Sequence, residues 1–227
     1  MRTIGTILGN KIVEQADKSV TFSAGATLDG DGANGQFGES PCYAPPSYVA
    51  PSTHPEGTLD LLANAGHPGN WFGVVTDDGE TTGTPIVQSA TDPCPGAFVS
   101  ATSLHLFDRS GGRLPPSSPF RYVDSATVSF IAVPPMIILG VAGVVLGCRC
   151  VVTNSSTGKS VEAVVADVGP SKHLGEISVA CAKAISVPVG STHAASSGGA
   201  SSPTIHYQLF PGIAAVVNGV TYPLQHS

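Results

Sequence analysis

Apolar and polar residues alternate in short runs along much of the chain, which is the pattern of half-buried β-strands. In the first half we expect strands in "SVTFSAGATL" (19–28), "NWFGVVTD" (70–77), "TPIVQSA" (84–90) and "AFVSATSLHLFD" (97–108). Glycine, proline and threonine separate these runs, so each strand is predicted to end in a turn.

Further strands are predicted along the second half of the chain. They are "RYVDSATVSFIAVP" (121–134), "GVVLGCRCVVTN" (143–154), "SVEAVVAD" (160–167), "TIHYQLF" (204–210) and "IAAVVNGVTYPL" (213–224). The turn "SSTGK" and the pair Asn218-Gly219 predict two hairpins.

Helical spacing is found in two segments only. Residues 57–66 predict a short helix that ends at Gly66, and 175–186 place apolar residues on one helical face. The pattern therefore predicts a mainly β fold, a barrel of short strands with loop insertions and a few short helices. We expect a single domain over 1–227, with an N-terminal extension at 1–20 and a Ser/Gly-rich loop at 190–203.

The composition agrees with a turn-rich globular protein: 27 Gly, 19 Pro and only 11% charged residues. A hydrophobic share of 41% is too high for a disordered chain. The formal net charge of −6 argues against nucleic acid or an anionic membrane as partner, and it suits a neutral or cationic ligand. Ordinary acidic solubility explains the same charge.

The five cysteines do not form a metal-binding pattern, since there is no CxxC motif and no histidine at ligand spacing. Cys42 and Cys94 lie in proline-rich loops that a disulfide could staple. Cys148 and Cys150 share one face of a predicted strand, and Cys181 lies on the second predicted helix. We expect neither a metal nor another cofactor.

The run "FIAVPPMIILGVAGVVLGC" is the one stretch apolar enough to suggest a membrane helix. A Pro-Pro pair and three glycines interrupt it, and the unbroken part is shorter than the ~20 residues that a spanning helix needs. We interpret it as buried strands. No secretory leader is visible at the N-terminus, although an extracellular location is expected for the function considered below.

Asp167 and Glu176 are the first candidates for chemistry. Two carboxylates at the rim of a β-barrel can cleave a glycosidic bond, one as general acid and the other as general base. Asp167 ends an apolar strand, where desolvation would raise its pKa and suit it to be the acid. Glu176 would lie in a first helical turn, where the helix dipole favours the anion and suits a base. Alternatively, Glu176 is only a helix-start carboxylate and Asp167 only a turn former.

The segment "GCRCVVTNSSTGKSVEAVVADVGPSKHLGEISVACAKAI" resembles the signature of double-psi β-barrels, such as rare-lipoprotein-A type lytic transglycosylases and expansin-like domains. More specifically, the chain resembles family 75 glycoside hydrolases, the chitosanases. The matching stretches are "TLDGDGAN" (27–34), 121–134, "VVADVGPSKHLGEISVACAKAI" (164–185) and "IHYQLFPG" (205–212).

This resemblance implies a six-stranded double-psi barrel and hydrolysis of β-1,4-glucosamine linkages within chitosan, with inversion at the anomeric carbon. It places the catalytic pair on Asp167 and Glu176 and leaves open which of them is the acid. We expect a monomer whose partner is chitosan or its oligosaccharides, with no nucleic acid and no membrane.

A cleft for chitosan should present further carboxylates, because each can face a substrate ammonium. Asp29, Asp31 and Asp124 are the candidates. The D-x-D-G pattern at 29–32 would also suit calcium, but Ser40 stands where a calcium loop requires Glu. A plain acidic turn remains the other interpretation.

Aromatic residues make up only 6% of the chain, although sugar rings pack on flat faces. Tyr122 and Tyr207 are candidate sugar contacts, whereas Trp71 is better explained as packing. His206 could touch substrate or be a structural hydrogen-bonding residue. No G-x-S-x-G elbow and no phosphate-binding glycine motif occurs.

Two other functions fit the same residues. A peptidoglycan-cleaving barrel would use Asp167 alone as acid and base. A non-catalytic carbohydrate-binding barrel would tolerate the loss of Glu176.

Overall fold

The computed structural model describes residues 1–36, 66–67, 69–189 and 199–225. The chain forms two compact units. The first comprises Met1–Asp29, Val128–Val189 and Gly198–Ser227, and the second comprises Gly30–Thr127 and Gly190–Ser197. The sequence-based assignment of a single domain stays a prediction.

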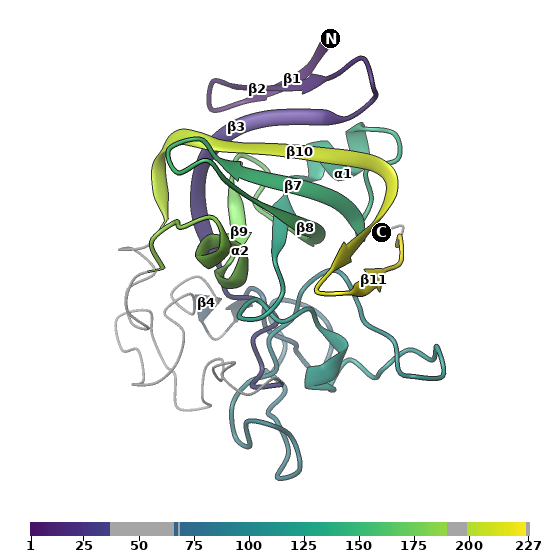
Figure 1. Cartoon of the computed structure of the whole chain (residues 1–227). Helices are drawn as coiled ribbons and strands as arrows, with labels where there is room; N and C mark the ends of the chain where they lie inside the picture. Colours follow the sequence, from purple (N-terminus) through teal and green to yellow (C-terminus); the bar gives the residue numbers. More distant parts are fainter. Residues whose placement is uncertain (37–65, 68, 190–198, 226–227) are drawn as a thin grey trace. The chain divides into compact units, whose positions relative to one another are not determined.

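The first unit is built on a closed six-stranded barrel (Figure 1). Around the barrel the strands follow the order β3 (Val20–Asp29), β9 (Glu176–Ser178), β6 (Phe130–Val133), β8 (Lys159–Val168), β7 (Cys148–Asn154) and β10 (Ala200–Val217), and β10 pairs with β3 to close it. The pairs β3–β9 and β6–β8 are parallel, and the other barrel pairs are antiparallel. The predicted mainly β class and six-stranded double-psi barrel are confirmed.

The barrel interior is filled by one row of apolar residues after another. Leu28, Ile177, Ile131 and Val165 are register partners across four neighbouring strands, and all are buried. Side chains alternate between the two faces of a strand, so the next row, which contains Ala132 and Glu176, faces outward. This alternation positions the candidate site.

Three free cysteines, Cys148, Cys150 and Cys181, are buried in this unit. Burial raises the pKa of Cys150 and raises that of Cys181 to about 12, so both thiols stay protonated and unreactive. In the second unit Cys94 is disulfide-bonded, while Cys42 lies outside the described residues.

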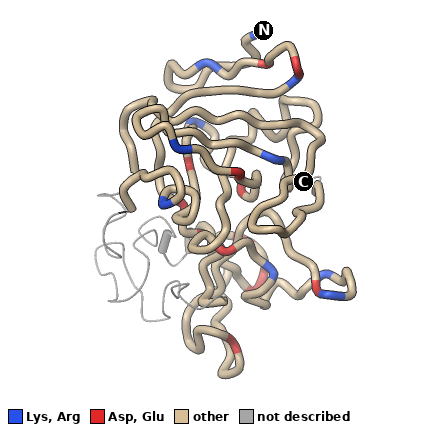
Figure 2. Tube along the Cα trace, in the orientation of Figure 1, with Lys and Arg blue, Asp and Glu red and all other residues tan. Residues whose placement is uncertain are grey.

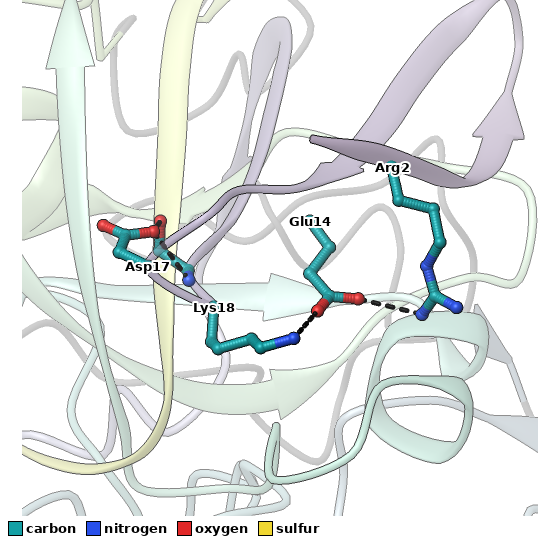
Figure 3. Close-up of polar contacts among 5 residues, drawn as sticks. Arg2, Glu14, Asp17 and Lys18 are labelled. Carbon is teal, nitrogen blue, oxygen red and sulfur yellow. Dashed lines mark hydrogen bonds and ion pairs between the residues drawn. The ribbon is translucent and has the colours of Figure 1, made fainter.

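The N-terminal extension is an antiparallel hairpin, β1 (Arg2–Ile7) and β2 (Asn10–Glu14), and β2 extends the sheet beside β3. Glu14 accepts hydrogen bonds from Arg2 at 2.8 Å and from Lys18 at 2.9 Å (Figure 3). The hydrogen bond and charge of Lys18, together with Arg2, lower the pKa of Glu14. The sequence pattern missed this hairpin because its alternation is short and polar.

The C-terminal hairpin confirms one prediction and corrects another. Asn218 and Gly219 both have positive φ and join β10 to β11 (Val220–Tyr222), as the Asn-Gly pair predicted. The two strands expected at 204–210 and 213–224 are mostly one long strand, β10, with a register shift between Phe210 and Ala214. β10 already begins at Ala200, inside the segment 190–203 that was expected to be loop; 190–198 lie outside the described residues.

The second predicted helix is shorter than expected, and the apolar run 130–148, interpreted as buried strands, is strand only at its ends and contains a helix, α1, that was not predicted. α1 spans Pro135–Gly140 and α2 spans Val179–Ala184, with the Ser178 hydroxyl capping α2 by accepting from the backbone N–H of Cys181. The helix predicted from 175 is wrong at its start, because residues 176–178 pair with both β3 and β6 as β9. Of the predicted helix at 57–66, residues 57–65 lie outside the described residues, and Gly66 belongs to a short strand. Among the residues that the structure describes, no helix is long and apolar enough to span a membrane.

The described part of the second unit contains little regular structure. Its described elements are β4 (Gly66–His67), β5 (Asn70–Trp71) and the 3-10 helix η2 (Pro119–Arg121). The strands predicted at 70–77, 84–90 and 97–108 appear mainly as isolated bridges, such as Val74 with Ser100 and Val87 with Phe98. Asn34 holds this unit together, because its side chain donates to the Gly32 and Ser100 carbonyls and accepts from the Ser100 N–H. Charged side chains are sparse along the traces of both units (Figure 2).

Candidate active site

Asp167 owes its position to a β-bulge in β8. Ile131 pairs with Val165, but the next residue of β6, Ala132, pairs with Asp167, so Ala166 is an extra residue. Strict alternation would turn Asp167 to the same face as Val165, which is the barrel interior. The bulge turns it outward instead, as bulges near functional sites often do. The Asp167 residue is 9% exposed, and its Oδ1 accepts a hydrogen bond from the Val168 N–H at 2.8 Å.

Glu176 reaches the same face from the opposite side. It is the first residue of β9 and pairs with Ala132 in β6 and with Thr27 in β3. Register partners present their side chains on one face of a sheet. Asp167 and Glu176 therefore stand in one row, with the small side chain of Ala132 between their strands.

The electrostatics of the pair differ from the expectation. Burial, followed by repulsion from the Asp167 charge, raises the pKa of Glu176 to about 7. The sequence pattern predicts a helix dipole that stabilises the Glu176 anion, but α2 begins only at Val179 and Ser178 caps it. Glu176 is thus a strand residue whose pKa of about 7 keeps it largely protonated at mildly acidic pH, which reverses the acid and base roles that the local pattern favoured.

Gly169 lies directly against the Glu176 carboxylate. A β-carbon added at Gly169 would come within 2.3 Å of Glu176 Oε2 and 3.5 Å of the Ala132 β-carbon. The absence of a side chain at 169 therefore leaves the space that Glu176 occupies. The backbone N–H of Gly169 donates to the Val133 carbonyl at 3.0 Å, so this contact is held by the end of the β6–β8 ladder.

His173 extends the row on the side of β3. This residue lies in the loop between β8 and β9, and its Nε2 is 3.0 Å from Thr27 Oγ1. The backbone N–H of Thr27 donates to the Gly175 carbonyl at 2.7 Å, which ties the same loop to β3. The loop that joins the two carboxylates is therefore anchored at its far end beside Glu176.

Asp29 brings a third carboxylate close to Asp167. It is the last residue of β3, is 7% exposed, and has a carboxylate oxygen within 4.8 Å of one from Asp167. Two carboxylates this close repel each other when both are ionised, and a cationic group placed between them would relieve that repulsion. Asp29 is thus the predicted substrate carboxylate that the first unit brings to the candidate pair.

The other two predicted carboxylates belong to the second unit. The Asp31 side chain lies against Gly73, where an added β-carbon would come within 2.3 Å of its Oδ1. Asp124 is 1% exposed, and its Oδ1 accepts a hydrogen bond from the Ala126 N–H at 2.8 Å. Asp124 therefore has a structural role in a turn. Contact of either residue with substrate stays a prediction.

The predicted aromatic contacts are core residues in this structure. Tyr122 is 3% exposed, packs with Val75 and Val99, and donates its hydroxyl to the Pro116 carbonyl. Tyr207 is 1% exposed, stacks on Phe22 with ring centroids 4.7 Å apart, and donates to the Gly25 carbonyl.

His206 is the exposed member of the predicted set, and its Nδ1 is 2.6 Å from Ser23 Oγ. β10 pairs Tyr207 with Phe22 and His206 with Ser23, so the side chains of Tyr207 and His206 lie on opposite faces of the strand. Of Tyr122, Tyr207 and His206, His206 alone is therefore exposed enough to contact a ligand.

Sequence reasoning missed Thr27, Ala132, Gly169 and His173. Their signal exists only in the register of strands far apart in the chain, and no local pattern contains it. No protein-family model matches the chain, and no curated protein matches it.

Proposed function

We propose that this protein is an endo-acting glycoside hydrolase that cleaves β-1,4-glucosamine linkages of chitosan with inversion. The observation that carries the proposal is the outward-facing row in which Glu176, with a pKa of about 7, shares Ala132 as register partner with Asp167. A protonated and an ionised carboxyl on one face are the two groups that glycoside hydrolysis needs. The resemblance to family 75 chitosanases falls on the same two residues.

In this proposal Glu176 is the general acid. Below pH 7 it carries a proton, which it donates to the glycosidic oxygen as the bond breaks. Asp167 is the general base, which takes a proton from the water that attacks the anomeric carbon. Each turnover then ends with Glu176 ionised and Asp167 protonated, and proton exchange with solvent restores the starting state.

The position of Asp29 favours chitosan over uncharged polysaccharides as the substrate. Its carboxylate lies close to Asp167, where a glucosamine ammonium would relieve the repulsion between the two acids. The overall charge of −6 agrees with a cationic polymer. Asp167 would then serve the base step while Asp29 holds the substrate amine nearby.

The test is the release of reducing ends from chitosan, chitin and peptidoglycan by the full chain, with proton NMR of the anomer first formed from chitosan. We expect activity on chitosan and release of the α-anomer from its β-linkages. Glu176→Gln and Asp167→Asn should each abolish turnover. Glu162→Gln is the matched control, because Glu162 is an exposed carboxylate of the same strand β8, paired with Arg149.

The same assay separates the other functions. An anhydro product from peptidoglycan would identify a lytic barrel that needs Asp167 alone. Binding without any bond cleavage, unchanged in Glu176→Gln, would identify a carbohydrate-binding barrel. Release of the β-anomer would replace the inverting mechanism by a retaining one.

A further inference from the structure

A second concave site lies on the outer face of the barrel. Figure 1 shows the hairpin β1–β2 followed by β3, β10 and β7, and the site is formed by β2, β3, β10 and β7. Its cavity is about 300 Å³. Ligand pockets range over about 300–1,000 Å³, so this one suits a single small unit.

Most residues that line the cavity face outward from β2, β3, β10 and β7, and the core residues Phe22 and Tyr207 lie at its base. Its polar lining residues include Lys11, Ser23, Thr153, His206 and Gln208, and the apolar residues Val13 and Val151 also contribute. Hydroxyl, imidazole and amide groups around a shallow cavity offer both donors and acceptors, which is what the hydroxyl groups of a sugar require.

Several of these polar groups are already oriented by neighbours. Ser23 Oγ lies 2.6 Å from His206 Nδ1, Thr153 Oγ1 lies 2.8 Å from Ser160 Oγ, and the Gln208 amide donates to Ser19 Oγ at 3.1 Å. Such contacts restrict the rotamers of the lining residues before any ligand arrives, which lowers the entropy cost of binding.

The charge of the cavity is opposite to that of the candidate active site. Lys11 lines it, and no carboxylate is among its lining residues. Glu14, next to Val13, faces away from the lining and binds Arg2 and Lys18. Glu162, the register partner of Val151, is paired with Arg149. A glucosamine ammonium would therefore meet a cation here and no unpaired anion.

The cavity is also closed off from the carboxylate row along β3. A β-carbon added at Gly25, between Ser23 and Thr27, would come within 2.2 Å of the Ala200 carbonyl oxygen. The backbone of β10 therefore covers the outward face of β3 at this point. The cavity is a separate site rather than a continuation of the cleavage site.

We infer that this cavity binds an uncharged N-acetylated sugar unit, apart from the site of cleavage. The inference rests on the proposed function for the identity of the polymer, which would be a partially acetylated chitosan. The acetamido methyl would pack on Val13 and Val151, while Ser23, Thr153 and His206 bond the hydroxyls. The chain would then hold its polymer by acetylated units and cleave it between glucosamine units.

The test follows backbone amide signals by NMR in the full-length Glu176→Gln protein, titrated with N,N′-diacetylchitobiose and with its fully deacetylated form. The acetylated disaccharide should shift the Thr153 and His206 signals, and the deacetylated one should leave them unmoved. Thr153→Arg should fill the cavity and weaken binding of the acetylated sugar about tenfold or more, the loss expected for one or two hydrogen bonds. Lys11→Glu, an exposed change, should let the deacetylated sugar bind.

Equal shifts with both sugars, or shifts confined to the surroundings of Ala132 and Gly169, would overturn the inference. This readout needs no catalysis, so it is independent of the proposed hydrolysis. If chitosan is cleaved but the cavity signals do not move, the second site fails alone. If the signals move but no bond is cleaved, the proposed function fails and the sugar-binding site stands.

Discussion

Asp167 and Glu176 are both register partners of Ala132, one on each side of β6. This relationship places two carboxylates on one face although one strand is parallel to β6 and the other antiparallel. It also makes each carboxylate an electrostatic influence on the other, as the raised pKa of Glu176 shows.

Replacing Glu176 should stabilise the protein at alkaline pH. Its pKa rises from 4.5 to about 7 on folding, so the folded state binds more protons than the unfolded state between these values. Stability is then lost as the pH rises through this window, by on the order of 3 kcal/mol in total. Glu176→Gln should remove that loss. The measurement is unfolding in denaturant of the wild-type protein and of Glu176→Gln. The two proteins should have similar free energies of unfolding at pH 4.5, and the variant should be the more stable one at pH 8. A variant less stable than the wild type at pH 8 would contradict this prediction.

Removing the Asp167 charge should lower the pKa of Glu176 without restoring its ordinary value. Burial is the larger cause of the raised pKa and the Asp167 charge the smaller. In Asp167→Asn, the carboxyl carbon of Glu176, followed by carbon-13 NMR, should titrate below 7 and above 4.5. A pKa at or above the wild-type value would mean that the two carboxylates do not interact.

A single methyl group at Gly169 should impair catalysis more than folding. In Gly169→Ala the new β-carbon would collide with Glu176 Oε2 and push the carboxyl out of its position. Misplacement of a catalytic group by about 1 Å can cost about 100-fold, so we expect a kcat loss of that order. Gly140→Ala is the control, because a β-carbon there meets no atom within 4 Å. Equal activity of the two variants would show that Glu176 needs no such space.

Replacing Asp29 should affect substrate binding, whereas replacing Asp124 should affect the stability of the fold. Asp29→Asn should weaken binding of chitosan oligomers more than of acetylated ones, by about 1–3 kcal/mol for one charge-assisted bond. Asp124→Asn should instead lower the free energy of unfolding, because the Asp124 carboxylate is buried in a turn. Binding to immobilised substrate and chemical unfolding would be measured on both variants. A selective loss of chitosan binding in Asp124→Asn would assign it to the cleft.

The fold was predictable where the pattern is local. Alternation located β3, and the Asn218-Gly219 pair located the last hairpin, since both signals lie within a few neighbouring residues. Strand assignment failed for 70–108, where a similar alternation accompanies isolated bridges. There the turns are so frequent that few residues can pair before the chain changes direction.

The two carboxylates of the candidate site were predictable from the sequence, but the local structure that positions them was not. The resemblance pointed to Asp167 and Glu176. The spacing of apolar residues predicts a helix at Glu176, but residues 176–178 form strand β9 because they pair with both β3 and β6. The bulge at Ala166 has no sequence signature, because an alanine in an apolar run looks the same in or out of register.

The order of the strands in the chain has a consequence for biosynthesis. β3 is made before residues 30–127, whereas β6, β8, β9 and β10 are made after them. A nascent chain must therefore carry an apolar strand without its partners while the whole of this segment is synthesised. An unpaired strand edge is an aggregation hazard, so β2, which pairs with β3 early, would serve as a temporary cover for one edge. The row of Thr27, Glu176, Ala132 and Asp167 can assemble only after β9 has left the ribosome.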